Sequence, residues 1–254
     1  MLTLLKSKRN LILVFTAIFF FQNTTIQAQS KTFTVKSFDK VIVSPHLEVV
    51  FKTGEEEKVL VEMLTESLDE MNVEVKGKTL QLYLDDAKIV TEKDKEKSTK
   101  SRTVAAYKGT VAKVIVYYKK VKTFSLRGEE RFYFEDAIIS DKIIFNIYGA
   151  SQVLMKDVTL KELKVSIYGE SHLKIENGSI ENQKIIGYGE SVVDLLQVNN
   201  KSAKITAYGD GSYQCNVSNT LKIVSYGEPI ITYKGSATLE KGLSIGEVEI
   251  VKIN

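Results

Sequence analysis

The stretch SIYGESHLKI (166–175) has four relatives in the same chain, and together they decide the fold. NIYGASQVLM stands at 146–155, IGYGESVVDL at 186–195, TAYGDGSYQC at 206–215, and the shorter VSYGEPIITY at 224–233. Their glycines belong to a series that recurs at intervals of 18 to 21 residues: Gly128, Gly149, Gly169, Gly189, Gly209, Gly227 and Gly246. A period of this length indicates a repeated structural unit.

Within each unit, apolar residues alternate with polar ones. Counted from the five central glycines, the even positions are mostly apolar, and the column four residues before the glycine contains Phe145, Val165, Ile185, Ile205 and Ile223. The odd positions are mostly polar. A period of two is that of a strand with one buried face, and the helical period does not fit. We therefore expect strands whose glycines lie at turns on the inward face, where a side chain would crowd the bend.

The length of the repeat selects the architecture. Twenty extended residues measure about 66 Å at ~3.3 Å per residue, which suits one coil of short strands and turns. Two-helix repeats need more than ~30 residues, and propeller blades need ~40 or more. The sequence therefore predicts an all-β fold, with an N-terminal strand region (33–90) continuing into a short right-handed parallel β-helix-like stack (111–254). Gly54 and Gly77 lie in stretches typical of hairpin turns, and the charged segment 91–103 is expected to be a solvated loop.

The N-terminus predicts export. Lys6, Lys8 and Arg9 precede the apolar run LILVFTAIFFF, and Ala28 is a small residue suited to cleavage. We expect a signal peptide over 1–28, then a single β domain over 29–254 with no membrane span. Removing the signal takes three of the 35 Lys and Arg residues and none of the 32 Asp and Glu residues. The remaining charges balance, so nothing favours nucleic acid or an anionic membrane as a partner.

Several stretches resemble a known family. FDKVIVSPHLEVVFKTGEEEKVLVE near the N-terminus, then VEVKGKTLQLYL and VAKVIVYYKKVKTFSLRG, then the repeated glycine-acid coils, are similar to the head GIN domain family of putative autotransporter adhesins from Bacteroidetes-type bacteria. The resemblance covers roughly residues 33–240. It implies a β-helix-like fold and a role at the cell surface or in the periplasm. The family motif is typically Ser-Gly-Ser-Gly-Asp, whereas here a tyrosine precedes each central glycine.

The residues around the glycines are the candidate site. Tyrosines and acids occupy outward positions and are expected to form two parallel stripes: Tyr148, Tyr168, Tyr188, Tyr208 and Tyr226, with Glu170, Glu190, Asp210 and Glu228. The tyrosines either contact a ligand, by stacking on sugar rings or meeting a partner protein, or form a self-stacking ladder that stabilises the coils. Oligomer contact is one version of the structural role.

The sequence offers little for catalysis or metal binding. The acids follow the repeat, whereas a catalytic pair would normally interrupt it. The only histidines, His46 and His172, are far apart, so no zinc site is expected and no cofactor is predicted. A calcium ion among the stacked acids remains open. The lone Cys215 can form no internal disulfide and is expected to be a small buried hydrophobe.

The sequence thus favours a non-catalytic, exported protein located in the periplasm or at the cell surface. We expect an adhesin-like or structural role in the envelope, in which the tyrosine and acid face binds a glycan or a cell-surface protein. A homo-oligomer is compatible with this prediction. The alternative is a polysaccharide-active lyase or hydrolase, because parallel β-helices carry such enzymes.

Overall fold

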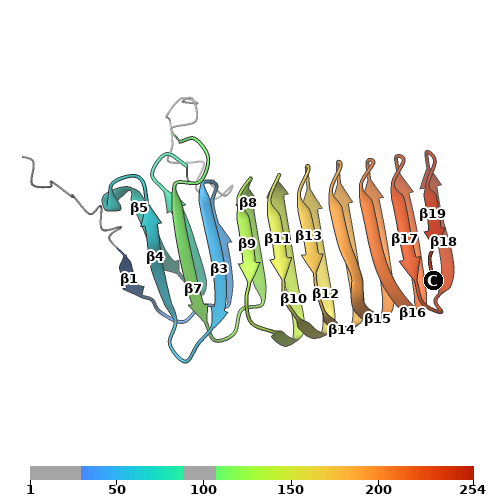
Figure 1. The fold of residues 1–254 in the computed structure, drawn as a ribbon, viewed down its shortest axis with the longest axis horizontal. Coiled ribbons are helices and arrows are strands. Elements are labelled where there is room, and N and C mark those ends of the chain that lie inside the picture. The colour runs from blue at the N-terminus through green and yellow to red at the C-terminus, as the bar shows by residue number, and fades with distance from the viewer. Residues whose placement is uncertain (1–29, 88–106) are drawn as a thin grey trace, which may run out of the picture.

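A computed structural model describes residues 30–87 and 107–254, so the predicted signal peptide and the charged loop lie outside the described residues. The described residues form nineteen strands, β1–β19, and one short 3₁₀ helix, η1 (Leu68–Glu70), with no α-helix among them. The strands belong to one continuous sheet, which is wound into coils placed side by side along the long axis of the molecule (Figure 1). The prediction of an all-β fold with stacked coils is confirmed.

The regular part of the stack repeats a long strand, a turn and a short strand. Its strands are β8 (Thr123–Gly128), β9 (Arg131–Phe134), β10 (Ile138–Gly149), β11 (Gln152–Met155), β12 (Val158–Tyr168), β13 (His172–Ile175), β14 (Gly178–Tyr188), β15 (Val192–Tyr208), β16 (Ser212–Tyr226), β17 (Ile230–Lys234), β18 (Thr238–Ile245) and β19 (Glu249–Lys252). Neighbouring coils pair in parallel, and equivalent repeat positions are partners, as in Phe145↔Val165 and Val165↔Ile185. In-register parallel pairing explains why one position keeps its character through the repeat.

Each coil turns where the two-residue alternation slips. In the coil of residues 158–177, the buried inward positions are Val158, Leu160, Leu163, Val165, Ile167, Ser171, Leu173 and Ile175. Between Leu160 and Leu163 two successive residues stay outside the core, as do three at 168–170 and two at 176–177. A strand cannot place two neighbours on one face without a bend. The coil therefore has three walls.

The N-terminal strands enter the same stack, but out of chain order. They are β1 (Lys31–Thr34), β2 (Lys40–Val43), β3 (Leu47–Thr53), β4 (Lys58–Leu64), β5 (Met71–Lys76), β6 (Thr79–Leu84) and β7 (Ala112–Tyr118). The coil made by β2 and β3 pairs in parallel with β8 and β9 on one side and with β6 and β7 on the other. A coil from the start of the domain is thus inserted between two coils that follow it in the chain.

Antiparallel strands cover the N-terminal end of the stack. β4 pairs with β7, β1 pairs with β4, and β5 pairs with β6. The hairpin expected at Gly77 is present between β5 and β6, where Gly77 has a φ of 61°. The hairpin expected at Gly54 is wrong: β7 lies between β3 and β4, so the strands that flank Gly54 are not partners. The turn at Gly54 predicts that its flanking strands pair with each other, but β7 occupies that edge of β3 as a parallel partner.

Columns of apolar side chains fill the interior. The column Phe145, Val165, Ile185, Ile205 and Ile223 is at most 3% exposed. In the N-terminal coils the core is aromatic, because Phe51, Phe124 and Phe134 pack with Phe145 at centroid separations between 4.5 and 5.4 Å. The burial of these columns supplies the main stabilising term of the stack.

One buried tyrosine accounts for two irregularities of the repeat. Tyr213 is 1% exposed and stands where earlier coils have Val153, Leu173 or Val193. A Cβ added to Gly187 would lie 1.8 Å from the Tyr213 hydroxyl, and one added to Gly211 would lie 2.7 Å from it. Earlier coils carry isoleucine at the position of Gly187 and serine at that of Gly211. The two glycines therefore make room for the larger ring.

Candidate functional site

The seven repeated glycines lie at one corner of the stack. All have positive φ, between 77° and 130°: Gly128, Gly149, Gly169, Gly189, Gly209, Gly227 and Gly246. A Cβ on Gly169 would lie 2.4 Å from the carbonyl oxygen of Gly149, and the same contact recurs up the stack at 2.4 to 3.1 Å. A left-handed backbone and a close approach to the preceding turn both require glycine. The expectation that these glycines face inward is wrong for Gly149, Gly169, Gly189 and Gly246, which are exposed. The chain has already begun to turn at these positions, so the alternation of inward and outward residues along the strand no longer applies.

The serine two residues after the glycine points inward and holds the turn. Ser171 Oγ donates to the carbonyls of Gly149 and Tyr168, both at 3.1 Å, and Ser151 Oγ bonds in the same way to Gly128 and Tyr148. Both serines are fully buried. One hydroxyl hydrogen cannot satisfy two carbonyls at once, so the serine links its own turn to the preceding one through a shared bond.

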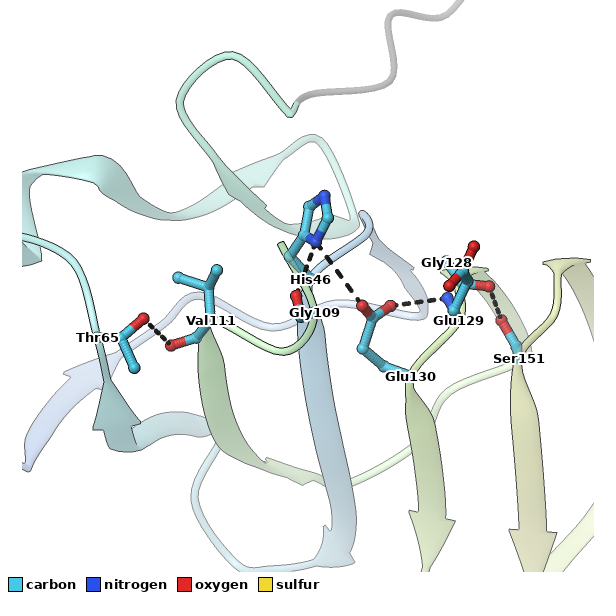
Figure 2. Close-up of polar contacts among 8 residues, drawn as sticks. All are labelled: His46, Thr65, Gly109, Val111, Gly128, Glu129, Glu130 and Ser151. Atoms are coloured by element: carbon cyan, nitrogen blue, oxygen red, sulfur yellow. Dashed lines mark hydrogen bonds and ion pairs between the residues drawn. The ribbon is translucent and has the colours of Figure 1, made fainter. Parts of the chain in front are cut away.

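The first turn of the series is built differently, as Figure 2 shows. Glu130 takes the place of the serine and is 6% exposed, and its Oε2 accepts the backbone N–H of Glu129 at 2.9 Å. Its Oε1 lies 3.9 Å from His46 Nδ1, which donates to the carbonyl of Gly109 at 2.8 Å. This cluster joins the N-terminal coils to the regular stack. The histidine is therefore engaged in turn contacts.

The five tyrosines form a continuous stack on the outer face of the wall that ends at the glycine turns. Neighbouring ring centroids are 4.8, 4.6, 4.9 and 4.9 Å apart, and the ring planes differ by at most 8°. The guanidinium of Arg127 covers the first ring, 5.1 Å from the centroid of Tyr148. At the other end Tyr226 is in register with Ile245, which is 58% exposed. The sequence left two roles open for these rings, and the geometry provides the self-stacking ladder.

Stacking decides which part of each ring a ligand can reach. The rings lie face to face along the stack, so the inner rings have no free face on which a sugar could stack. The hydroxyls, by contrast, reach solvent, because none makes a hydrogen bond among the described residues and none is a buried unpartnered atom. Burial and the neighbouring phenols of Tyr148 and Tyr188 raise the pKa of Tyr168. The ladder thus presents ring edges and neutral hydroxyls.

The acids of the motif lie in the turns beside the ladder. Glu170, Glu190, Asp210 and Glu228 are all exposed. Asp210 Oδ1 accepts the backbone N–H of Glu228 at 2.9 Å, which links two successive turns. None of the four lines the hollow of about 650 Å³ around Val50, Tyr133 and Leu154 or the hollow of about 940 Å³ along residues 137–144. The four carboxylates therefore form an exposed column outside both hollows.

A second ladder escaped the sequence reasoning. Lys164, Lys184, Lys204 and Lys222 are partners on four neighbouring strands, four residues before the tyrosine of each coil. The side chains between the two ladders are Ser166, Ile186, Thr206 and Val224, which are shorter. The signal was available, because the lysine recurs with the period of the glycine at an outward position. It was missed because only the residues next to the glycine were compared as stripes.

The short-strand wall carries a separate hollow of about 650 Å³. Its outward apolar side chains Val50, Tyr133 and Leu154 are partners on β3, β9 and β11, and each is partly buried. The cations at its rim are already paired: Arg131 lies 3.5 Å from Glu48, and Lys174 lies 3.8 Å from Asp194. The exposed His172 also lines it. The hollow is thus apolar at its centre and electrically balanced at its rim.

Chemically reactive groups are sparse in the part of the chain that the structure describes. No cluster of three or more His, Cys, Asp or Glu side chains suited to a metal ion occurs there. Cys215 is fully buried, and burial raises the pKa of its thiol to about 12. A thiol of this kind packs as a hydrophobe. Among the same residues, no helix has the length and apolar character needed to span a membrane.

Comparison with known proteins supports the fold and identifies the family. The chain is similar to the crystal structure of a "putative adhesin" from Bacteroides fragilis NCTC 9343, with 20% identity and a TM-score of 0.73 over 89% of this chain and 96% of that one. A "putative adhesin" from Parabacteroides merdae ATCC 43184 (16% identity, TM-score 0.64) and a "putative lipid binding protein" from Parabacteroides distasonis ATCC 8503 (16%, 0.60) cover the same shares. No curated protein matches the chain. Because the family model described as "Putative auto-transporter adhesin, head GIN domain" matches residues 37–237, the chain belongs to that family.

Proposed function

We propose that the protein is a non-catalytic, adhesin-like binding protein of the cell envelope, acting in the periplasm or at the cell surface. Its partner is a glycan or a cell-surface protein that contacts the face carrying the tyrosine ladder and the acids of the adjoining turns. The observation that carries the proposal is the tyrosine stack itself. It runs over five coils and presents hydroxyls that the described residues do not use internally.

A preorganised ladder suits binding better than catalysis. The rings are held by their neighbours, so a ligand that contacts their edges does not have to immobilise them. Phenol hydroxyls donate and accept hydrogen bonds and repeat at the spacing of the strands, about 4.8 Å. A linear polymer with hydroxyl groups along its length can therefore contact several tyrosines at once. Its affinity then exceeds that of a single contact, because one polymer chain makes all of the weak contacts together.

The test separates hydroxyl contact from scaffolding. Changing Tyr168→Phe, Tyr188→Phe and Tyr208→Phe together keeps the stacked rings and removes three hydroxyls. We expect the melting temperature to stay within a few degrees, while binding to glycans on an array falls at least tenfold. Tyr133→Phe on the other wall is the matched control and should bind like the parent. If the triple variant binds as well as the parent, the ladder does not contact the ligand.

A second candidate function arises from the hollow around Val50, Tyr133 and Leu154. Its apolar centre suits the acyl chain of a lipid, and a structural neighbour carries the description of a putative lipid binding protein. A fluorescent fatty acid should then bind to the parent protein and be lost on Leu154→Asp, whereas the triple phenylalanine variant should keep it. Absence of fatty-acid binding by the parent would eliminate this candidate.

A further inference from the structure

We infer that Lys164, Lys184, Lys204 and Lys222, together with the tyrosine ladder beside them, form a binding strip for a linear acidic polysaccharide, one that carries carboxylate or sulfate groups along its length. This inference rests on the proposed binding function and narrows its ligand class. The lysine ladder is the observation that supports the narrower class.

The lysines form a straight row along the stack. Lys164 pairs in register with Lys184, Lys184 with Lys204, and Lys204 with Lys222. Neighbouring strands of a sheet are about 4.8 Å apart, so the row spans about 14 Å. Its ends are defined by Ile144 before the first lysine and Glu240 after the last. The site is thus long enough for a few sugar rings in an extended chain.

The row meets a single acid in register, Glu240 beside Lys222 at its end, and is otherwise without counter-charge among the described residues. None of the four lysines makes an ion pair there, whereas Lys113, Lys142 and Lys161 elsewhere on the surface each pair with an acid. Lys184, Lys204 and Lys222 are exposed and Lys164 is partly exposed.

The row next to the lysines offers no neutralisation either, because Asn182, Ser202 and Thr220 are neutral and Glu162 is engaged with Lys142 at 2.7 Å. Like charges at strand spacing repel one another. A polyanion lying along the stack relieves this repulsion for several lysines at once and releases its own counterions.

The tyrosine ladder lies four residues further along each strand, about 13 Å from the lysine row. Lys184, Ile186 and Tyr188 all point outward from β14, so the two ladders share one face. Ammonium groups on one side and phenol hydroxyls on the other can both donate hydrogen bonds. Acidic sugars present carboxylate or sulfate oxygens and neutral hydroxyls on the same chain, and both groups find partners on this strip.

The geometry favours a glycan over a single-stranded nucleic acid. Proteins that bind single strands stack the bases on free aromatic faces. Here the faces of Tyr168, Tyr188 and Tyr208 are covered by the neighbouring rings at 4.6 to 4.9 Å. The strip therefore has no free aromatic faces on which bases could stack, and it offers only ring edges, hydroxyls and lysine ammonium groups. Nucleic acid and anionic lipid surfaces therefore become alternative outcomes of the test.

The experiment uses the full chain without its first 28 residues and measures fluorescence anisotropy at 25, 50, 100 and 200 mM NaCl. The probes are a labelled oligogalacturonate, maltohexaose as a neutral oligosaccharide, a single-stranded DNA of equal charge, and phosphatidylglycerol vesicles. We expect binding to the oligogalacturonate, none to maltohexaose, and a log–log salt slope near about −3 for four lysines at ~0.7 per charge.

The ladder variant carries Lys184→Gln, Lys204→Gln and Lys222→Gln. It should bind the oligogalacturonate at least tenfold more weakly at 50 mM NaCl, and its salt slope should be smaller by about 2. The control carries Lys119→Gln, Lys120→Gln and Lys156→Gln, which removes the same charge from exposed lysines elsewhere, and should stay within twofold of the parent. Arginine at the three ladder positions should preserve binding. Circular dichroism confirms that each variant is folded.

Three results would overturn the inference: no binding of the oligogalacturonate by the parent, equal losses in the ladder and control variants, or tighter binding to the DNA or the vesicles. The proposed function is tested separately, by the neutral glycans and the triple phenylalanine variant. If neutral glycans bind and the triple phenylalanine variant loses them while the lysine variant does not, the binding face stands and only the acidic ligand class is wrong. If binding depends on the lysines but is unchanged in the triple phenylalanine variant, the lysine row acts without the ladder and the proposal of a shared strip is wrong.

Discussion

The fit between Gly187 and Tyr213 provides the sharpest test of how the coils pack. Gly187 is buried, on ordinary strand backbone, and an alanine at such a site normally stabilises a strand by about 0.5–1 kcal/mol relative to glycine. Here the added Cβ would lie 1.8 Å from the Tyr213 hydroxyl and 2.7 and 2.9 Å from two ring carbons. The ring has little room to withdraw, because a Cβ on Gly211 would lie 2.7 Å from the Tyr213 hydroxyl and Ser191 Oγ lies 3.5 Å from it. We therefore expect Gly187→Ala to lower the free energy of unfolding by about 1–3 kcal/mol.

A double-mutant cycle identifies the cause of this loss. Tyr213→Leu restores the aliphatic character of earlier coils but loses buried area, and we expect it to cost about 2–4 kcal/mol by itself. In the leucine background the obstruction is gone, so Gly187→Ala should be neutral or stabilising by up to ~1 kcal/mol. The coupling energy between the two positions should then be about 1–4 kcal/mol.

Urea unfolding followed by circular dichroism measures all four proteins, with equal m-values as the condition for comparing them. Gly54→Ala is the control, since its added Cβ would meet its nearest atoms at 3.4 Å, an ordinary contact. If Gly187→Ala costs the same in the tyrosine and leucine backgrounds, then Tyr213 is not the reason for the glycine, and the packing account of this coil is refuted.

Three further predictions follow from the turns, the core and the buried ionisable groups. Gly169→Ala should lower the free energy of unfolding by more than the ~1–2 kcal/mol of a left-handed alanine, because its Cβ would also approach the carbonyl oxygen of Gly149 at 2.4 Å. Gly77→Ala has a similar φ but open space around it and isolates the backbone term, so equal losses would contradict the close approach. Gln183→Leu should raise the free energy of unfolding by about 1–3 kcal/mol in the same assay. Both amide atoms of Gln183 are buried without a partner, and Leu163 and Leu221 occupy this column in other coils. A loss of stability would show that the amide is satisfied in solution. Finally, burial raises the pKa of Cys215 from its ordinary 9.0 to about 12, and the folded chain keeps this proton where the unfolded chain loses it. The buried neutral thiol therefore stabilises the fold fully below pH 9, and the free energy of unfolding should decline between pH 9 and 12 by up to ~1.4 kcal/mol per pH unit. The urea midpoint should fall over this range, and a midpoint that does not change with pH would refute the reasoning.

The tyrosine ladder illustrates how far sequence reasoning could reach into the site. The period placed the five rings at equivalent positions of successive coils, and parallel pairing then required them to be neighbours. Their face-to-face orientation was not in the sequence, because it depends on the rotamer that each ring adopts against the next. That orientation removes sugar stacking on the inner rings and leaves edges and hydroxyls as the accessible groups.

The insertion of the β2–β3 coil shows a different limit. Both strands were expected, but their partners lie as far as β8 and β9, more than eighty residues along the chain, and no local signal specifies such a pairing. The hairpin wrongly expected at Gly54 has the same origin, since β7 takes the edge that a sequence-adjacent strand would have used.

By itself, the sequence determined the strand character, the twenty-residue coil and the glycine turns, because alternation and period are properties of single strands repeated in register. The tertiary structure decided the order of the N-terminal coils, the room made for Tyr213 and the face-to-face orientation of the tyrosine rings. Those features depend on which walls meet and how side chains share space across them, and neither is encoded in the spacing of residues along one strand.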